Sequence, residues 1–169
     1  MQLRFIVLSP RGATMGKINL QKVLIGGLIA GVVLNVIDSL LFGVVLKDQM
    51  AAAMAALNRP PMTNAQVPWF VFLDFVAGIY LVWLYAAIRP RFGAGPATAA
   101  RAGAAAWFLG GLLITLFMWP MHLMPANTQI TTLVVGLIEW PLAGVVGAKF
   151  YTEGAGVGAG AGAGMGARM

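Results

Sequence analysis

Four long apolar stretches dominate this sequence, and each one is long enough to cross a lipid bilayer as a helix. About 20 helical residues, at ~1.5 Å rise per residue, span the roughly 30 Å of hydrocarbon in a bilayer. The stretches are bounded by charged, proline or aromatic residues and run over 23–46, 69–88, 102–119 and 130–149. The sequence therefore predicts an all-α integral membrane protein, folded as an antiparallel four-helix bundle.

Composition and residue types exclude several other classes of protein. Hydrophobic residues make up 60% of the chain and charged residues only 9%, too few to cover a water-soluble globule. The chain has no Cys, which excludes disulfides, thiolate metal ligands and a cysteine nucleophile. The chain has a single His, two serines at Ser9 and Ser39, and no phosphate-binding loop after a strand. These residues offer little from which to build a catalytic site. We therefore expect neither an enzyme nor a bound cofactor.

The distribution of Lys and Arg predicts the orientation of the spans. The basic residues of one side are Arg4, Arg11, Lys17, Lys22, Arg89, Arg91, Arg101, Lys149 and Arg168. The other side has only Lys47 and Arg59. Because basic residues near span ends are retained in the cytoplasm, both termini are predicted to be cytoplasmic. This placement, with attraction to anionic lipid, accounts for the net charge of +6, so we expect no nucleic-acid partner.

The chain divides into three parts by composition. These are a basic N-terminal lead over 1–22, a four-helix domain over 23–151 and a Gly- and Ala-rich tail over 152–169. We expect 1–14 to be disordered, and we expect the tail to be flexible because Gly and Ala offer little to bury. Translation from Met1 and translation from Met15 are both compatible with the sequence.

Small residues at helical spacing indicate the packing faces of the spans, because helices in lipid associate where their backbones approach closely. The predicted packing positions are Gly27, Gly31, Gly78, Gly111, Gly136 and Gly147. The inward face of the third span is predicted to hold Ala104, Gly111, Thr115 and Met118. The Gly27 and Gly31 pair serves equally well for packing within one chain, in a homodimer or in a larger membrane complex.

Three carboxylates lie inside the predicted spans, in the outer half or near the midplane. At ~1.5 Å per residue, the depths of Asp38, Asp74 and Glu139 are roughly 7 to 14 Å below the outer boundary of the hydrocarbon core. No Lys or Arg lies inside a span to pair with them, and an unpaired ionised carboxylate in hydrocarbon is costly. Bound protons, hydrogen bonds, water or a bound cation must neutralise them. The hydrogen-bond donors available in the spans are Asn35, Ser39, Tyr80, Thr115 and Trp140.

Two functions are compatible with these acids, which together with Asn35 and Thr115 form a predicted polar site in the bundle. The sequence slightly favours an accessory or interaction subunit, in which protonated acids link helices by hydrogen bonds. The alternative is a proton-coupled or cation-coupled transport element that uses the acids as its binding site. Convergence of the three acids on one water-accessible cavity would favour transport.

A lesser alternative is copper binding at the outer face. Methionine and imidazole ligands suit Cu(I). The segment after the third span holds Met118, Met121, His122 and Met124, and the facing loop adds Met50, Met54 and Met62. Methionine is also a common filler at interfaces, so this metal site is the weakest of the hypotheses.

Three segments resemble a family of small, uncharacterised four-span bacterial membrane proteins. They are KDQMAAAMAALNRPPM from Lys47, GIYLVWLYAAIRPRFGAGPA from Gly78, and the Arg-Ala-Gly that begins at Arg101. The resemblance covers 16–151 and leaves out the lead and the tail. It implies a bacterial inner membrane and the same four-span plan, with no site residues to carry over.

Overall fold

The computed structural model describes residues 17–154, and its regular structure there is entirely helical, with no strand. The predicted lead and tail lie mostly outside this range. The helical elements are α1 (Leu20–Leu40), η1 (Leu41–Val45), α2 (Lys47–Ala56), α3 (Val67–Phe92), α4 (Pro96–Trp107), η2 (Phe108–Leu113), α5 (Ile114–Met118), η3 (Trp119–Met121) and α6 (Ala126–Ala148). The all-α prediction is therefore confirmed.

Four continuous helical runs are long and apolar enough to cross a membrane, as predicted. They cover Leu20–Val45, Val67–Phe92, Pro96–Met121 and Ala126–Ala148. The third run starts before the predicted 102, because Gly93 and Gly95 take positive φ angles in a tight turn and Pro96 then opens the helix. The fourth run starts before the predicted 130, directly after Pro125. Polar and alanine-rich first turns hid both starts from a hydropathy count.

Two of the runs contain wide π turns. In η1 the amide of Leu46 donates to the carbonyl of Leu41 at 2.7 Å, five residues back, and η2 interrupts the middle of the third run. A π turn shifts the faces of the helix that follows it. In the third run this shift separates the residues of α4 that pack inside the protein from those of η2 and α5.

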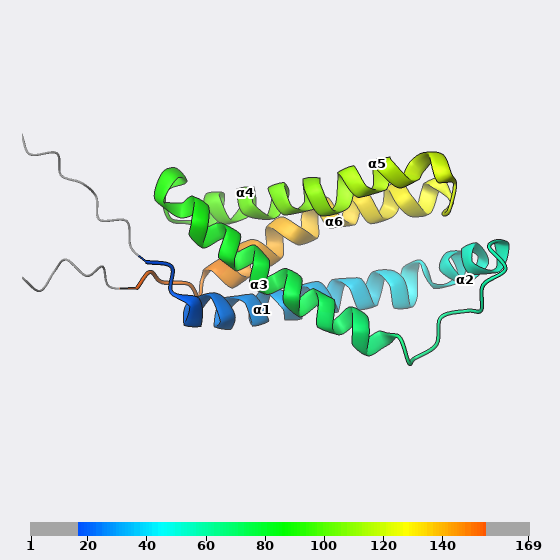
Figure 1. The fold of residues 1–169 in the computed structure, drawn as a ribbon, viewed down its shortest axis with the longest axis horizontal. Coiled ribbons are helices and arrows are strands. Elements are labelled where there is room, and N and C mark those ends of the chain that lie inside the picture. The colour runs from blue at the N-terminus through cyan, green and yellow to red at the C-terminus, as the bar shows by residue number, and fades with distance from the viewer. Residues whose placement is uncertain (1–16, 155–169) are drawn as a thin grey trace, which may run out of the picture.

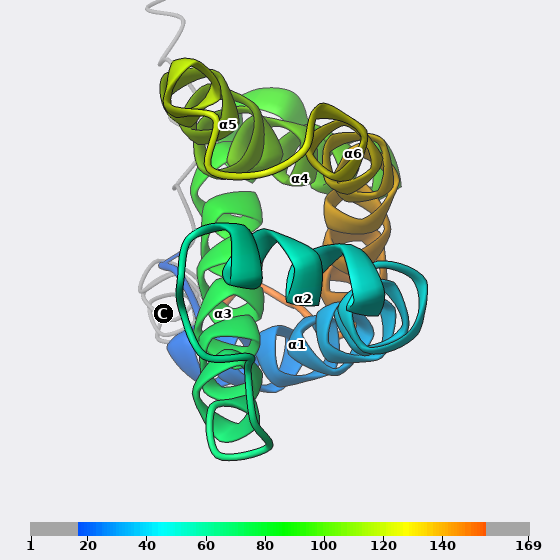
Figure 2. The ribbon, with the colours of Figure 1, turned by 90° about the vertical axis from the view of Figure 1, so that its right-hand side faces the viewer.

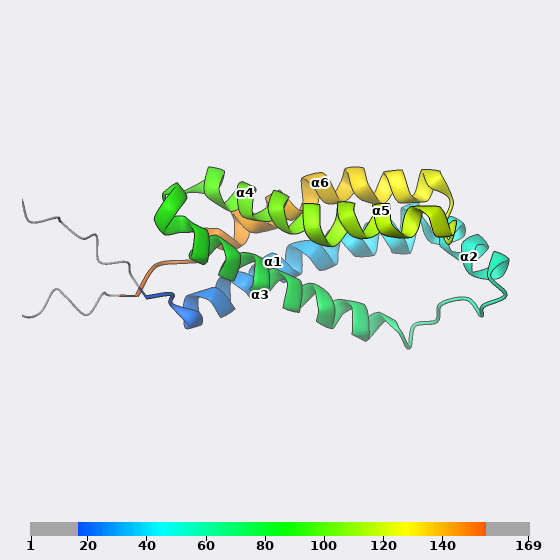
Figure 3. The ribbon, with the colours of Figure 1, turned by 45° about the horizontal axis from the view of Figure 1, so that its top comes forward.

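The helices pack as two hairpins. α1 packs along α3 and also contacts α6, while α4 packs along α6 and contacts α3 (Figure 1). We call the end with Asn19, Gly95 and Tyr151 the terminal end, and the opposite end the far end. Beyond Trp107 the third run no longer packs closely against α3, and Figure 3 shows α3 diverging from α5 and α6 toward the far end. The far end is covered by α2, which lies across it (Figure 2).

Glycines allow the closest helix contacts. A Cβ added to Gly78 of α3 would fall under 3.0 Å from backbone atoms of Gly27 and Gly31, so the Gly-x-x-x-Gly motif packs within one chain. Gly26 of α1 and Gly147 of α6 meet in the same way. None of these positions has room for a side chain, so glycine is required there for α1 to approach α3 and α6 at backbone distance.

The predicted inward face of the third run is only partly correct. The buried residues of α4 are Thr98, Ala99, Ala102, Gly103 and Ala106. Ala104, Gly111 and Thr115 are half-buried, and Met118 is exposed. The three nearest atoms to a Cβ on Gly111 belong to Trp107 of the same run, whose indole ring also lies against Gly136 of α6. For Thr115 and Met118 the π turns of η2 are the physical reason, because they rotate the later residues away from the α4 face.

Most of the surface of the four runs is apolar and uncovered. No more than 28% of the apolar window of any run is buried inside the protein. Large side chains such as Phe72 and Phe117 point outward, the latter 75% exposed. A surface of this kind is stable in hydrocarbon and unstable in water. The fold therefore suits a membrane, as the sequence predicts.

We expect Gly78→Ala to destabilise the fold and Gly43→Ala to leave it unchanged or slightly more stable. Both changes add the same methyl group, but nothing lies within 4 Å of a Cβ on Gly43. The difference in unfolding free energy should be roughly 1–3 kcal/mol, the usual cost of overpacking. Thermal unfolding of the two variants in detergent measures it. Equal stabilities would contradict the glycine contacts.

Candidate functional site

Glu139 is the buried acid of this protein. It lies in α6, one turn after Gly136 and two residues before Pro141, and only 4% of the residue is exposed. Trp107 of α4 packs against Gly136 and donates its indole N–H to the carbonyl of Leu133 at 3.2 Å, which fixes α4 on α6 beside the acid. The Oε1 atom of Glu139 is buried and has no hydrogen-bond partner among residues 17–154.

Asp38 and Asp74 lie on the other hairpin and face the same interior. Both are half-buried. The backbone carbonyl of Asp74 lies 3.2 Å from where a Cβ of Gly31 would stand, so the glycine contact holds α3 close to α1 at this level. Asp38 is within electrostatic range of both Asp74 and Glu139, and Asp74 is within range of Glu139. The three acids thus interact through their charges, although they are not arranged to hold a metal ion together. We call Asp38, Asp74 and Glu139 the carboxylate cluster.

No protein group neutralises the carboxylate cluster within the part of the chain that the structure describes. None of the five donors available in the spans donates to a carboxylate there. The ion pair found in residues 17–154 joins Arg89 to Glu153 at the terminal end, far along the helices from these acids. Proximity of like charges makes simultaneous ionisation of all three acids unfavourable. The cluster therefore requires protons, water or a cation from outside the described chain.

Two residues predicted for this site lie elsewhere. Asn35 donates to the carbonyls of Gly31 at 2.9 Å and Val71 at 3.4 Å, and it lines a groove on the outer side of the α1 and α3 pair. Three residues at ~100° each fall about 60° short of a full turn, so the Asn35 side chain lies about 60° around α1 from that of Asp38 and on the side of this groove. Thr115 is half-exposed in α5, after the π turns, and is not among the hydrogen-bonded side chains of residues 17–154. The carboxylate cluster is correspondingly poorer in donors than predicted.

The predicted copper ligands lie on an exposed loop at the far end. Met118, Met121, His122 and Met124 are all exposed, and His122 has a left-handed backbone with φ of 50°. His122 and Met124 line a hollow of about 380 Å³ together with residues of α2. Within residues 17–154 no group of three or more His, Cys, Asp or Glu residues is arranged to hold a metal ion.

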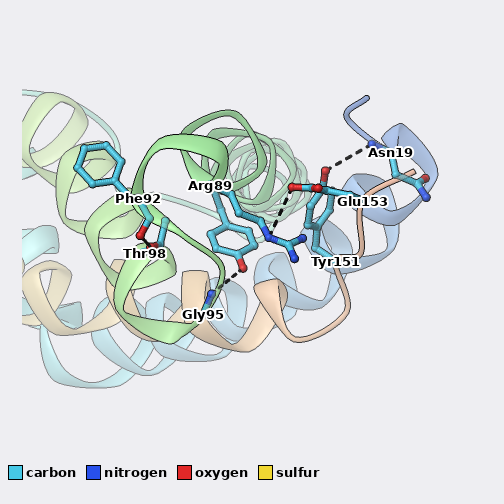
Figure 4. A network of polar contacts seen from close by, with 8 residues as sticks. Asn19, Arg89, Phe92, Gly95, Thr98, Tyr151 and Glu153 are labelled. Atoms are coloured by element: carbon cyan, nitrogen blue, oxygen red, sulfur yellow. Dashed lines mark hydrogen bonds and ion pairs between the residues drawn. The ribbon is translucent and has the colours of Figure 1, made fainter. Parts of the chain in front are cut away.

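A second polar network ties the terminal end together (Figure 4). The Arg89 guanidinium lies 5.6 Å from the centre of the Tyr151 ring and pairs with Glu153 at 3.7 Å. The Tyr151 hydroxyl accepts from the amide of Asn19 at 3.5 Å. In the segment predicted as a flexible tail, Glu153 thus has a partner, and the amide of Gly154 donates to the carbonyl of Lys17 at 3.3 Å. Residues 155–169 of that tail lie outside the described residues. These contacts join the ends of α1, α3 and α6, and they serve structure.

Sequence reasoning missed Thr128, which is only 1% exposed and whose Oγ1 has no partner within the described chain. It lies at the start of α6, before the predicted start of the fourth span at 130. A signal was present, because Thr128, Thr132 and Glu139 follow the spacing i, i+4 and i+11 of a single helix face. The hydropathy window excluded the first of them.

Oxygen ligands in an apolar surrounding favour two kinds of ligand. Carboxylates in membrane helices carry protons in relays, and carboxylate oxygens bind hard cations. No family model, curated protein or solved structure matches this chain. The resemblance to small four-span bacterial proteins therefore stays a prediction, and function is argued from the geometry of the carboxylate cluster.

We expect Glu139→Leu to leave the unfolding free energy unchanged or to raise it. Removing a buried polar group that has no partner relieves a desolvation cost of about 1–3 kcal/mol. If the acid instead linked helices by hydrogen bonds, the same change would destabilise the protein. Trp107→Phe is the matched control, because it deletes the bond to Leu133 and should cost about 1 kcal/mol. Thermal unfolding in detergent compares the two variants.

Proposed function

We propose that this chain is a multi-pass protein of a bacterial cytoplasmic membrane that binds protons at the carboxylate cluster and couples their movement to transport. Four runs long and apolar enough to span a bilayer support the membrane location. The excess of Lys and Arg at the terminal end supports a cytoplasmic position for that end. The family resemblance of the sequence supports the bacterial inner membrane.

One observation carries the binding proposal: Glu139 is buried beside Asp38 and Asp74 with an unpartnered oxygen in the described chain. A buried acid without a partner costs stability, and proteins accept such costs at functional sites. The acids are close enough to interact. Binding of one positive charge therefore lowers both the repulsion between the carboxylates and the free-energy cost of burying them. A structural role in linking helices has less support, since the acids receive no hydrogen bond from residues 17–154.

An accessory or interaction subunit is the second candidate, and it is favoured by the outer groove of α1 and α3. Asn35 and Ser39 line this groove among Val32, Val36 and Phe75. Polar side chains that face lipid are available to hydrogen-bond a neighbouring helix. The two candidate functions differ in whether they need Glu139. Transport requires its carboxylate, whereas the accessory role does not.

Proton uptake in liposomes tests the transport proposal. We expect the native protein to move protons, followed by a pH-sensitive dye trapped inside the vesicles, under a potassium diffusion potential. The change Glu139→Gln should reduce the rate to that of protein-free vesicles, and Asp38→Asn and Asp74→Asn should reduce it in part. Replacing Na⁺ by choline on both sides distinguishes a proton site from a Na⁺ site.

The matched control for these variants is Asp48→Asn. Asp48 is an exposed acid in α2, outside the four membrane-spanning runs, so its change should leave the rate unaltered. Native protein without any flux of protons or Na⁺, or a Glu139→Gln variant with native flux, would refute transport and leave the accessory role.

Reporter fusions test the orientation. Green fluorescent protein placed after Met169 should fluoresce in bacteria, because the terminal end is proposed to be cytoplasmic. Alkaline phosphatase, which is active only outside the cytoplasm, should be active when inserted after Pro61, between α2 and α3. The reverse pattern would overturn the proposed topology.

A further inference from the structure

Four side chains in residues 17–154 hold a buried polar atom without a partner: Gln49 of α2, Arg89 at the terminal end of α3, and Thr128 and Glu139, which share one face of α6. Among residues 17–154, the buried polar side chains are those of Thr98, Thr128 and Glu139. Thr98 is satisfied, since its hydroxyl donates to the carbonyl of Phe92 at 3.2 Å. Thr128 Oγ1 and Glu139 Oε1 have no partner in that part of the chain. They lie eleven residues apart on the same helix face, which is about 16 Å along the axis.

Thr132 lies between these two residues on the same face. It is half-buried, and its hydroxyl donates to the carbonyl of Thr128 at 3.0 Å, which leaves its lone pairs free to accept. We call Thr128, Thr132 and Glu139 the threonine face. Their side chains therefore place oxygen atoms at intervals from the start of α6 to the carboxylate cluster. Buried oxygen atoms without protein partners are usually satisfied by water.

The threonine face begins beneath a hollow at the far end. Ala126, at the start of α6, lines this hollow of about 380 Å³ together with the loop before it and with Ala53 of α2. In Figure 2, α2 lies across the far end, and the Oε1 atom of its Gln49 is also buried without a partner within the described chain. The far end thus offers both space and unsatisfied oxygen atoms.

The opposite direction from Glu139 is sealed by apolar packing. The next residues of α6 on the interior side, Ala143 and Gly147, are buried, and Gly147 meets Gly26 of α1 with no room for a side chain. The surrounding buried residues are the side chains of Ala30, Leu81, Val82, Ala86, Ala99 and Ala102. Water has no polar partner along this route, so the packed half excludes it.

We infer that the carboxylate cluster is open to one side only: water, and a proton with it, reaches Glu139 from the far end along the threonine face. The packed half closes the site toward the terminal end. The identity of the ligand in this inference rests on the proposed function of the carboxylate cluster. The route itself follows from the placement of polar and apolar groups.

Cysteine accessibility tests the route, and the chain has no native Cys to interfere. Thr132→Cys and Ala143→Cys, in full-length protein in right-side-out and inverted vesicles, are exposed to a charged, membrane-impermeant methanethiosulfonate reagent and scored by mass. The reagent needs a thiolate in water. We expect Thr132→Cys to react from the far side at least tenfold faster than Ala143→Cys, and neither to react from the terminal side.

Val134→Cys is the matched control for exposure to lipid. Val134 is 56% exposed on the outer surface of α6, two residues from Thr132, and should stay unreactive because its surface faces hydrocarbon. Thr128→Cys repeats the test near the mouth of the route, should Thr132→Cys fold poorly. Equal reaction of Val134→Cys, reaction of Thr132→Cys from the terminal side, or no reaction of Thr132→Cys and Thr128→Cys from either side would overturn the inference.

The labelling result is independent of transport. Labelling with the expected pattern but without proton or Na⁺ flux would refute the transport proposal and leave the one-sided water route standing. Flux that depends on Glu139, together with unreactive cysteines on the threonine face, would support the carboxylate cluster and refute the route.

Discussion

The close backbone contact of α1 with α3 and α6 at glycine is the interaction on which the rest of the structure depends. Gly78 meets Gly27 and Gly31 near the middle of α1 and α3, and Gly26 meets Gly147 toward the terminal end. Helices that touch at backbone distance cross at an angle and separate beyond the crossing. The tight half is consequently sealed by small apolar residues, and the looser far half has room for α2 and for polar groups.

The carboxylate cluster lies where the tight half gives way to the loose one. Its position explains how three acids occupy the interior without a fixed cation: they are at the edge of the sealed region, next to a helix face that carries hydroxyl groups toward the far end. A cluster deeper in the tight half would have no access to water. A cluster nearer the far end would be hydrated and would gain little from binding a charge. The same geometry thus accounts for burial, for electrostatic coupling and for one-sided access.

Particular residues show how far sequence reasoning reached. Asp38, Asp74 and Glu139 could be singled out because acids in apolar runs are rare, and Gly27, Gly31 and Gly78 because small residues recur at helical spacing. Asn35 was predicted beside Asp38, but it lies about 60° around α1 from Asp38 and lines the outer groove. Gly111 and Thr115 follow a π turn, which no periodicity of ideal helices anticipates. Thr128 was hidden by the polar first turn of α6.

By itself, the sequence determined four long helices, their apolar surface, the acids within them and the excess of basic residues at one end, because these properties depend on composition and spacing along a single chain. Only the tertiary structure decided which side of each helix is enclosed, that the three acids lie within electrostatic range of one another, and that the bundle is tight at one end and loose at the other. These features depend on the crossing points of helices distant in sequence, and the crossing points are set by which glycines meet in space.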